Sequence, residues 1–112
     1  MQKLNILPLN FADGEIPLKN GSARLLFQIT LGCGCPTCAG GRFDPQRFHV
    51  RVELYNDKNG LAGTFQGKYT GDVSQFASDI TDVSPGHYLL EINATDPESG
   101  AAGRLNMNVN LV

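Results

Sequence analysis

In the final stretch of the chain, residues 104–112, polar and apolar side chains alternate from Arg104 to Leu111. Asparagine fills the polar positions after Arg104, and the apolar positions hold Leu105, Met107, Val109 and Leu111. Successive side chains of a β-strand point to opposite faces of a sheet, whereas a helix would spread these apolar residues around its circumference. Residues 104–112 are therefore predicted to form a strand with one face in the core and the other in water.

The same alternation recurs along most of the chain and predicts an all-β protein. Asn59-Gly60 is a strong hairpin signal between two of the alternating runs. A helix over residues 74–81 stays open as an alternative, because the apolar residues there also fit a spacing of 3.6. The predicted strands are residues 3–9, 23–29, 48–55, 61–69, 73–80, 86–96 and 104–112.

Seven strands separated by frequent turns are the pattern of a seven-stranded antiparallel immunoglobulin-like sandwich. The length of 112 residues matches one domain, so residues 1–112 are expected to form a single β-sandwich domain. Residues 83–103 read VSPGHYLLEINATDPESGAAG. This segment resembles the penultimate strand and following loop of bacterial immunoglobulin-like and fibronectin type III-like domains, which often read Pro-Gly-x-Tyr-x-Leu-x-Val-x-Ala-x-Asp before a Gly-rich turn.

The resemblance implies an architecture and no particular activity. It implies that Tyr88 points inward, with its hydroxyl group bonded to the backbone of residues 79–84, as in the tyrosine corner of many immunoglobulin-like folds. The chain has no Trp and lacks the two widely separated cysteines of antibody domains. Its core is therefore expected to consist of aliphatic and Phe side chains.

Charge and hydropathy exclude two classes of partner. The formal net charge is -2, and the basic residues are scattered from Lys3 to Arg104 instead of forming a stripe for phosphates. No stretch approaches the roughly 20 apolar residues that span a bilayer. We expect no nucleic-acid partner and no membrane span, and the oligomeric state stays open.

All three cysteines lie within the stretch LGCGCPTCAGG, residues 31–41. In the predicted topology this loop shares one end of the sandwich with His49, whereas His87 lies at the other end. Cys33, Cys35, Cys38 and His49 are therefore a candidate tetrahedral site for Zn²⁺, or for copper, because thiolate and imidazole are ligands that these metals prefer.

A disulfide is the simpler interpretation, since a staple would stiffen a long loop. Cys33–Cys38 or Cys35–Cys38 is expected, while Cys33–Cys35 is expected to be strained; three free thiols without a role are the remaining alternative. Cys35-Pro36-Thr37-Cys38 also resembles the C-P-x-C motif of glutaredoxin-like oxidoreductases, but the helix that this motif requires is not predicted after it.

The cysteines and the start of the chain bear on the cellular compartment of the protein. Residues 1–10 lack the apolar core of a signal peptide, and Met1 is either a native start or one that follows a removed signal or upstream domain. A location outside the cytoplasm (periplasm, cell surface or secreted) is favoured, since disulfides persist in oxidising compartments.

Calcium is a further candidate ligand at the end of the sandwich that holds the cysteine loop. The carboxylates predicted to lie there are Asp44, Asp72, Asp96 and Glu98. Their sequence context is typical of turns, and no fixed ligand spacing accompanies it, so a turn-forming role is favoured over Ca²⁺ binding.

No catalytic set is recognisable, since the two histidines are predicted at opposite ends and no nucleophile elbow or phosphate loop is present. We expect a non-enzymatic immunoglobulin-like module without a cofactor. It would bind a protein or carbohydrate at its loops or along an exposed edge strand, or space larger domains. The alternative is a small metal-binding protein that uses the cysteine cluster.

Overall fold

A computed structural model describes residues 3–112, and this part of the chain consists of eight β-strands and one short 3-10 helix. The strands are β1 (Leu4–Pro8), β2 (Glu15–Ile16), β3 (Ala23–Leu31), β4 (His49–Tyr55), β5 (Leu61–Tyr69), β6 (Gln75–Ile80), β7 (Gly86–Thr95) and β8 (Ala102–Leu111). The helix, η1, is Pro45–Arg47. Met1, and with it the question of the native start, lies outside the described residues. In residues 3–112 no helix is long and apolar enough to cross a membrane.

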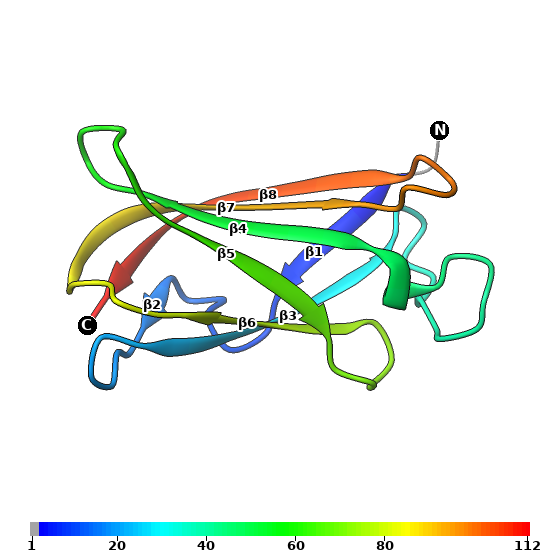
Figure 1. The fold of residues 1–112 in the computed structure, drawn as a ribbon, viewed down its shortest axis with the longest axis horizontal. Helices are drawn as coiled ribbons and strands as arrows, with labels where there is room; N and C mark the ends of the chain where they lie inside the picture. Colours follow the sequence, from blue (N-terminus) through cyan, green and yellow to red (C-terminus); the bar gives the residue numbers. More distant parts are fainter. Residues whose placement is uncertain (1–2) are drawn as a thin grey trace.

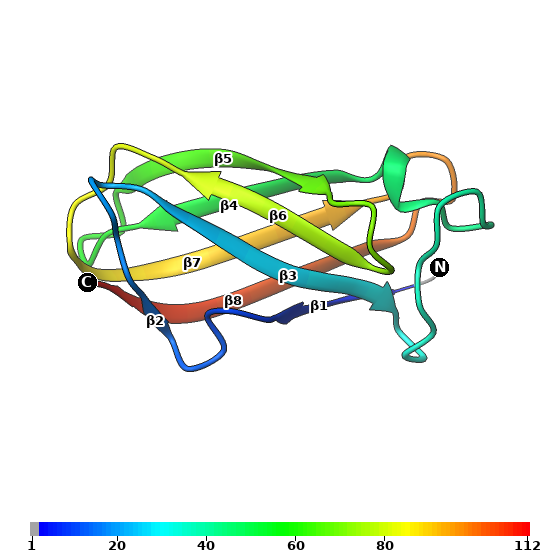
Figure 2. The same ribbon diagram turned by 90° about the horizontal axis from the view of Figure 1, so that it is seen from below.

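The strands fold over the core in two facing layers (Figure 1 and Figure 2). Hydrogen bonding follows one continuous order, β1-β3-β6-β5-β4-β7-β8-β2. β4, β7 and β8 lie in one layer and β3 and β6 in the other, while β5 runs obliquely from the first layer to the second (Figure 1). β1 pairs with β3, and Lys3 bridges to Ala102 at the start of β8. β1 and β5 therefore link the layers on opposite sides.

The predicted alternation in the last two strands is confirmed. In the register of β7 and β8, Leu90 lies opposite Met107 and Ile92 opposite Leu105. Leu90 and Ile92 are fully buried, and their partners on β8 pack against the same core, whereas the adjacent Asn106 is exposed. One face of this pair is therefore core and the other solvent, as the period of two requires.

The all-β class is confirmed, but the seven antiparallel strands expected are replaced by eight strands in a mixed sheet. β2 pairs in parallel with β8, through Glu15 with Asn110 and Ile16 with Leu111. A strand of two residues is too short to show a period, so the sequence does not reveal it. The open alternative of a helix over residues 74–81 was wrong: β6 pairs with β3 over six residues and buries Phe76 and Ile80.

The core consists of aliphatic and Phe side chains, as expected; Phe11, Phe27 and Phe76 are among the largest fully buried residues. Tyr88 packs against this core with its ring half-buried. Its hydroxyl group donates a 2.8 Å hydrogen bond to the Ser84 carbonyl oxygen. This bond falls within the stretch that the tyrosine-corner resemblance implies.

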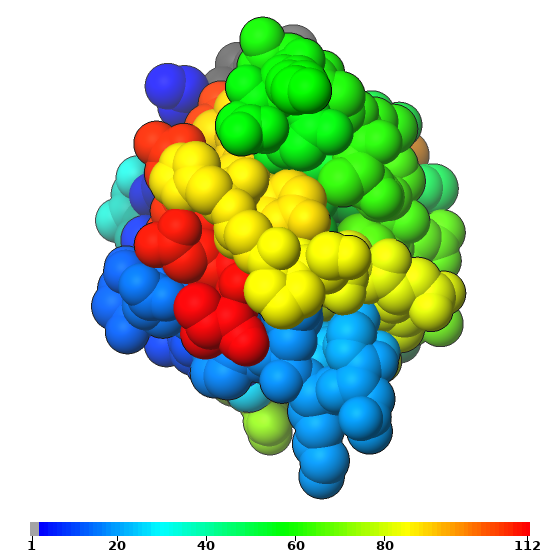
Figure 3. Space-filling view, turned by 90° about the vertical axis from the view of Figure 1, so that its left-hand side faces the viewer, coloured from blue at the N-terminus to red at the C-terminus, as the bar shows by residue number. Residues whose placement is uncertain are grey.

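The two ends of the molecule differ. Figure 3 views one end, where residues 81–89 (yellow) cross between the turn joining β4 and β5 (green) and the C-terminal residues (red). Val83 is buried there, and the His87 Nδ1 atom lies 2.9 Å from the Asn110 side-chain oxygen. The cysteine loop lies at the other end (Figure 1), so His87 is remote from the cysteines, as expected.

Candidate functional site

The cysteine loop, residues 32–47, is tied to the sandwich through Thr37. This residue is buried, and its amide donates to Ser74 Oγ at 2.8 Å. Its hydroxyl group donates to the Ile29 carbonyl oxygen at 2.7 Å, and the Ser74 amide donates to the Thr37 carbonyl oxygen at 3.1 Å. Thr37 is therefore an anchor that divides the loop into two parts, with Cys33 and Cys35 on one side and Cys38 on the other.

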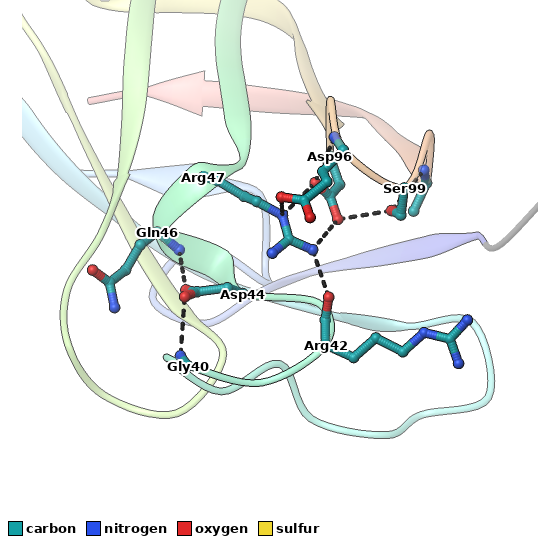
Figure 4. Close-up of polar contacts among 9 residues, drawn as sticks. Gly40, Arg42, Asp44, Gln46, Arg47, Asp96 and Ser99 are labelled. Atoms are coloured by element: carbon teal, nitrogen blue, oxygen red, sulfur yellow. Dashed lines mark hydrogen bonds and ion pairs between the residues drawn. The ribbon is translucent and has the colours of Figure 1, made fainter.

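The second part of the loop is held by Asp44, which caps helix η1. The Asp44 carboxylate accepts hydrogen bonds from the amides of Gln46 at 2.9 Å and Gly40 at 3.0 Å (Figure 4). These backbone donors, Gln46 first, lower the pKa of Asp44. Its carboxylate therefore stabilises the turn that leads into η1.

The third anchor is a buried ion pair between Arg47 of η1 and Asp96 at the end of β7. Asp96 has no exposed surface and accepts from Arg47 Nε at 2.8 Å and Nη2 at 3.0 Å (Figure 4). Ser99 Oγ donates to it at 2.7 Å and the Glu98 amide at 3.1 Å. Arg47, the largest cause, holds the pKa of Asp96 well below its usual range, and Ser99 and the Glu98 amide lower it further. Arg47 also donates to the Arg42 carbonyl oxygen.

These contacts involve three of the four carboxylates that were considered as calcium ligands. Asp44 and Asp96 accept hydrogen bonds from protein donors, and Glu98 lies 3.5 Å from Arg47. Among residues 3–112, no group of three His, Cys, Asp or Glu side chains is placed to hold a metal ion. The structure therefore does not bring the four carboxylates together as a calcium site.

Cys33 and Cys35 meet in a tight turn that continues β3. The Gly34 amide donates to the Leu31 carbonyl oxygen at 2.8 Å, and the Leu31 amide donates to the Cys35 carbonyl oxygen at 2.9 Å. Gly34 has φ +91°, a conformation that glycine adopts readily. Both cysteines are exposed free thiols, and their Sγ atoms lie 2.9 Å apart. The turn thus presents two adjacent sulfur atoms to solvent.

The contact between the thiols makes them unequal. The hydrogen bond from Cys35 is the largest cause that lowers the pKa of Cys33. The same bond raises the pKa of Cys35, and the charge of Cys33 raises it further. The contact therefore shifts the pKa values of the two thiols in opposite directions.

The other two predicted metal ligands lie apart from this pair. The sulfur–sulfur contact between Cys33 and Cys35 is the only one in residues 3–112, and Cys38 is an exposed free thiol beyond the Thr37 anchor. His49 is exposed at the start of β4. The four residues proposed for Zn²⁺ are therefore not assembled, and the set stays a prediction.

The expected disulfides are not supported. Neither Cys33–Cys38 nor Cys35–Cys38 is formed. The adjacent pair is instead Cys33 and Cys35, for which a disulfide was expected to be strained. The physical reason is Gly34: its positive φ closes a turn that an extended Cys-x-Cys segment would not make. No helix directly follows Cys38 either, so the context of the C-P-x-C motif is absent from the described residues.

A second candidate site is the open edge of β5. This strand pairs with β4 from Leu61 to Gly67, but with β6 only at Lys68 and Tyr69. β5 and β6 diverge beyond these two residues because β5 leaves the lower layer (Figure 1). On the β6 side, the next contact is Ser78 Oγ, which donates to the Gln66 carbonyl oxygen at 2.9 Å.

The open edge carries neither of the features that usually block strand addition. Residues 61–67 read LAGTFQG and contain no charged residue and no proline. Leu61 is 55% exposed at its start. The alternation of residues 61–69 predicts the strand, and a ligand is expected along an edge strand, but which strand is an edge depends on the sheet order. The uncharged stretch is the signal that could have indicated it.

A hollow of about 370 Å³ lies where β5 and β6 part. It is lined by Arg24, Gln66, Lys68, Ala77 and Asp79. Arg24 and Asp79 pair across it at 2.9 Å, whereas Lys68 belongs to none of the ion pairs within residues 3–112. The open edge therefore ends beside a hollow of net positive charge, in which the charge of Lys68 also lowers the pKa of Asp79 after the larger effect of Arg24.

No protein-family model matches the chain, and no curated protein matches it. Among solved structures, CopC from Methylosinus trichosporium OB3b aligns over 96% of this chain and 93% of its own, with a TM-score of 0.59 and 9% identity. A CARDB domain from Pyrococcus furiosus, solved with di-metal ions, aligns over 100% and 88% with 16% identity and a TM-score of 0.39, too low to support an argument. The likeness to CopC shows a shared β-rich fold. The resemblance to bacterial immunoglobulin-like and fibronectin type III-like domains stays an inference from residues 83–103.

Proposed function

We propose that this protein is a non-enzymatic β-sandwich module that binds an extended segment of a partner protein, which adds to the sheet as a strand beside β5. The observation that carries the proposal is the open, uncharged edge of β5 from Leu61 to Gln66. An unpaired strand edge offers a row of backbone donors and acceptors, and recognition by strand addition uses such a row.

The direction of one bond identifies which backbone groups are available. The Gln66 carbonyl oxygen accepts from Ser78 on the β6 side. Residues two apart in a strand direct their N–H and C=O groups to the same side. Thr64 therefore directs its N–H and C=O groups to the open side, where within the described residues no strand pairs with it. Ala62 is the extra residue of a β-bulge opposite Leu54 and Tyr55, so this rule does not extend to it. An incoming strand can satisfy these two groups of Thr64.

Lys68 indicates the chemistry of the partner segment. A strand added beside residues 61–66 ends next to the hollow that Lys68 and the Arg24–Asp79 pair line. An uncharged β-forming stretch that ends in an acidic residue would satisfy both the edge and the Lys68 ammonium group. The partner expected is therefore an extended peptide segment with an acidic end.

Thr64→Pro tests the proposal. Proline has no backbone N–H group to donate to an added strand, and its ring occupies the space beside the edge of β5. The fold should tolerate this substitution, since a strand edge that faces solvent is where sheets accept proline. As probe we suggest a synthetic peptide of alternating Val and Thr with two Asp residues at one end. Binding should slow hydrogen exchange at the Thr64 amide, Thr64→Pro should abolish binding, and Thr64→Val should retain it. Equal binding by Thr64→Pro would refute strand addition at β5.

Metal binding is a second candidate function, which the 2.9 Å contact between Cys33 and Cys35 favours. Two adjacent thiols are ligands that soft ions such as Cu⁺ prefer, and Zn²⁺ would need further ligands. Anaerobic titration with a Cu⁺ chelator complex tests it. One equivalent bound by the wild type and by Cys38→Ser, but lost in Cys33→Ser, would support a two-thiol site; equal loss in Cys38→Ser would support the larger set.

A further inference from the structure

We propose that Cys33 and Cys35 are a redox-active dithiol, which exchanges with disulfides and closes reversibly into a Cys33–Cys35 disulfide. The inference rests on geometry: two exposed sulfur atoms, 2.9 Å apart, in a turn that the backbone fixes. It depends on neither strand addition at β5 nor a bound metal ion.

The turn brings the sulfur atoms together before any reaction. Two backbone hydrogen bonds close it, from Gly34 to Leu31 and from Leu31 to Cys35. The bonded separation in a disulfide is about 2.05 Å, so small side-chain rotations suffice to close the bond. Holding reactants in contact replaces a bimolecular step by an intramolecular one and raises its rate by orders of magnitude.

The anchored loop selects this pair over the third cysteine. Cys35 is held by the Leu31 amide, and two residues later Thr37 is buried and bonded to Ser74 and Ile29. A bond from either thiol to Cys38 has to form across this anchor. Cys38 is therefore expected to remain a thiol when Cys33 and Cys35 are oxidised.

The exchange balances with a disulfide as co-reactant, such as glutathione disulfide. One thiolate of the pair attacks a sulfur atom of glutathione disulfide, forms a mixed disulfide and releases one glutathione thiolate. The second cysteine, as its thiolate, attacks the protein sulfur of the mixed disulfide, closes the Cys33–Cys35 bond and releases a second glutathione. The protein loses two electrons and two protons, and glutathione disulfide gains them as two glutathione molecules.

The test is incubation of the full chain with glutathione disulfide in the presence of a metal chelator. Remaining thiols are then alkylated and the bonds are mapped by tandem mass spectrometry. The expected product has an internal disulfide between Cys33 and Cys35 and one alkylated thiol, Cys38. Cys38→Ser should give the same disulfide, while Cys33→Ser and Cys35→Ser should stop at a mixed disulfide with glutathione.

Gly34→Ala and Gly40→Ala are a matched pair that tests the geometry. Both glycines lie in this loop with positive φ, +91° and +79°, and a Cβ at either would meet no atom within 4 Å. Both substitutions thus strain the backbone alike, but only the first disturbs the turn between the thiols. We expect Gly34→Ala to lower the equilibrium constant for closing the Cys33–Cys35 disulfide about tenfold and Gly40→Ala to leave it unchanged.

A disulfide that includes Cys38, or equal effects of the two substitutions, would overturn the proposal. Because the chelator excludes metal, failure of Cu⁺ binding would leave this result unaffected.

Discussion

Asp96 shows how a single buried carboxylate organises one end of the molecule. Four donor groups satisfy it: two from Arg47, one from Ser99 and one from the Glu98 backbone. A buried charge without such partners is very costly, so burial and the hydrogen bonds must arise together in folding. Asp96 therefore ties the loop after β7 to η1 and, through Arg47, to the base of the cysteine loop.

Asp96→Asn is expected to lower the free energy of unfolding at pH 7 by about 2 kcal/mol. The substitution removes one charge of a buried ion pair. The loss of stability is smaller than for a fully buried pair, because 27% of the Arg47 side chain is exposed. The folded-state pKa of Asp96 is depressed, so its stabilisation is present above the unfolded value of about 3.9 and is lost as the pH falls below it.

Urea denaturation between pH 7 and pH 2.5 checks this expectation. The difference between wild type and Asp96→Asn should narrow as the pH falls below about 4. Asp79→Asn is the control, because Asp79 and Arg24 form an exposed pair and its loss should cost less than about 0.5 kcal/mol. A difference for Asp96→Asn that stays constant with pH would show that its charge does not stabilise the fold.

For single residues, the sequence predicts contacts with nearby residues of the chain better than contacts with distant ones. The Tyr88 hydroxyl bonds to Ser84, four residues away, and the motif around Tyr88 implied that contact. For Asp96 a turn-forming role was favoured over calcium binding, and its bonds with Glu98 and Ser99 fit that role. Its ion pair with Arg47 was not predicted, because Arg47 is 49 residues distant and nothing in the spacing connects them. The contact between Cys33 and Cys35 was missed because it depends on the φ of Gly34.

Among the elements, the strands with a long alternating pattern were predicted and the edges of the sheet were not. β7 and β8 have their predicted faces because ten residues show a period of two clearly. β2, with two residues, has no period. The open edge of β5 results from the oblique course of the strand between the layers, and alternation within a strand contains no information about its neighbours.

The contact between β1 and β8 leads to a prediction at Gly103. A Cβ at this position would collide with the Leu4 carbonyl oxygen and lie 2.8 Å from its carbonyl carbon. Backbone atoms cannot rotate away, so Gly103→Ala should force β1 from β8 and lower the free energy of unfolding by about 3 kcal/mol. Thermal and chemical denaturation measure this.

Gly71→Ala is the control for this substitution. Gly71 has φ +102° and a Cβ there would meet nothing within 4 Å, so the change should cost only about 1 kcal/mol of backbone strain. If Gly103→Ala were no worse than Gly71→Ala, the close approach of β1 and β8 would not contribute to stability.

The whole molecule is held together where its two layers converge, near the cysteine-loop end. Phe76 of β6 stacks on Phe27 of β3 and on Phe48 at the start of β4, with ring centroids 6.2 and 6.0 Å apart. Tyr69 of β5 lies at 5.7 Å from the same ring. One side chain therefore contacts both layers and the strand that crosses between them, so the layers should unfold as a unit.

Phe76→Ala should accordingly lower the free energy of unfolding by about 3–5 kcal/mol, because it leaves a cavity that the surrounding rings cannot fill. The transition should remain single, with coincident curves from far-ultraviolet circular dichroism and tyrosine fluorescence, since no layer keeps a core of its own. Phe43→Ala is the control: Phe43 packs at the rim under Arg42, and its loss should cost about 1 kcal/mol. Two separate transitions in Phe76→Ala would show that each layer keeps a core of its own, and would contradict the inference that the two layers share one core.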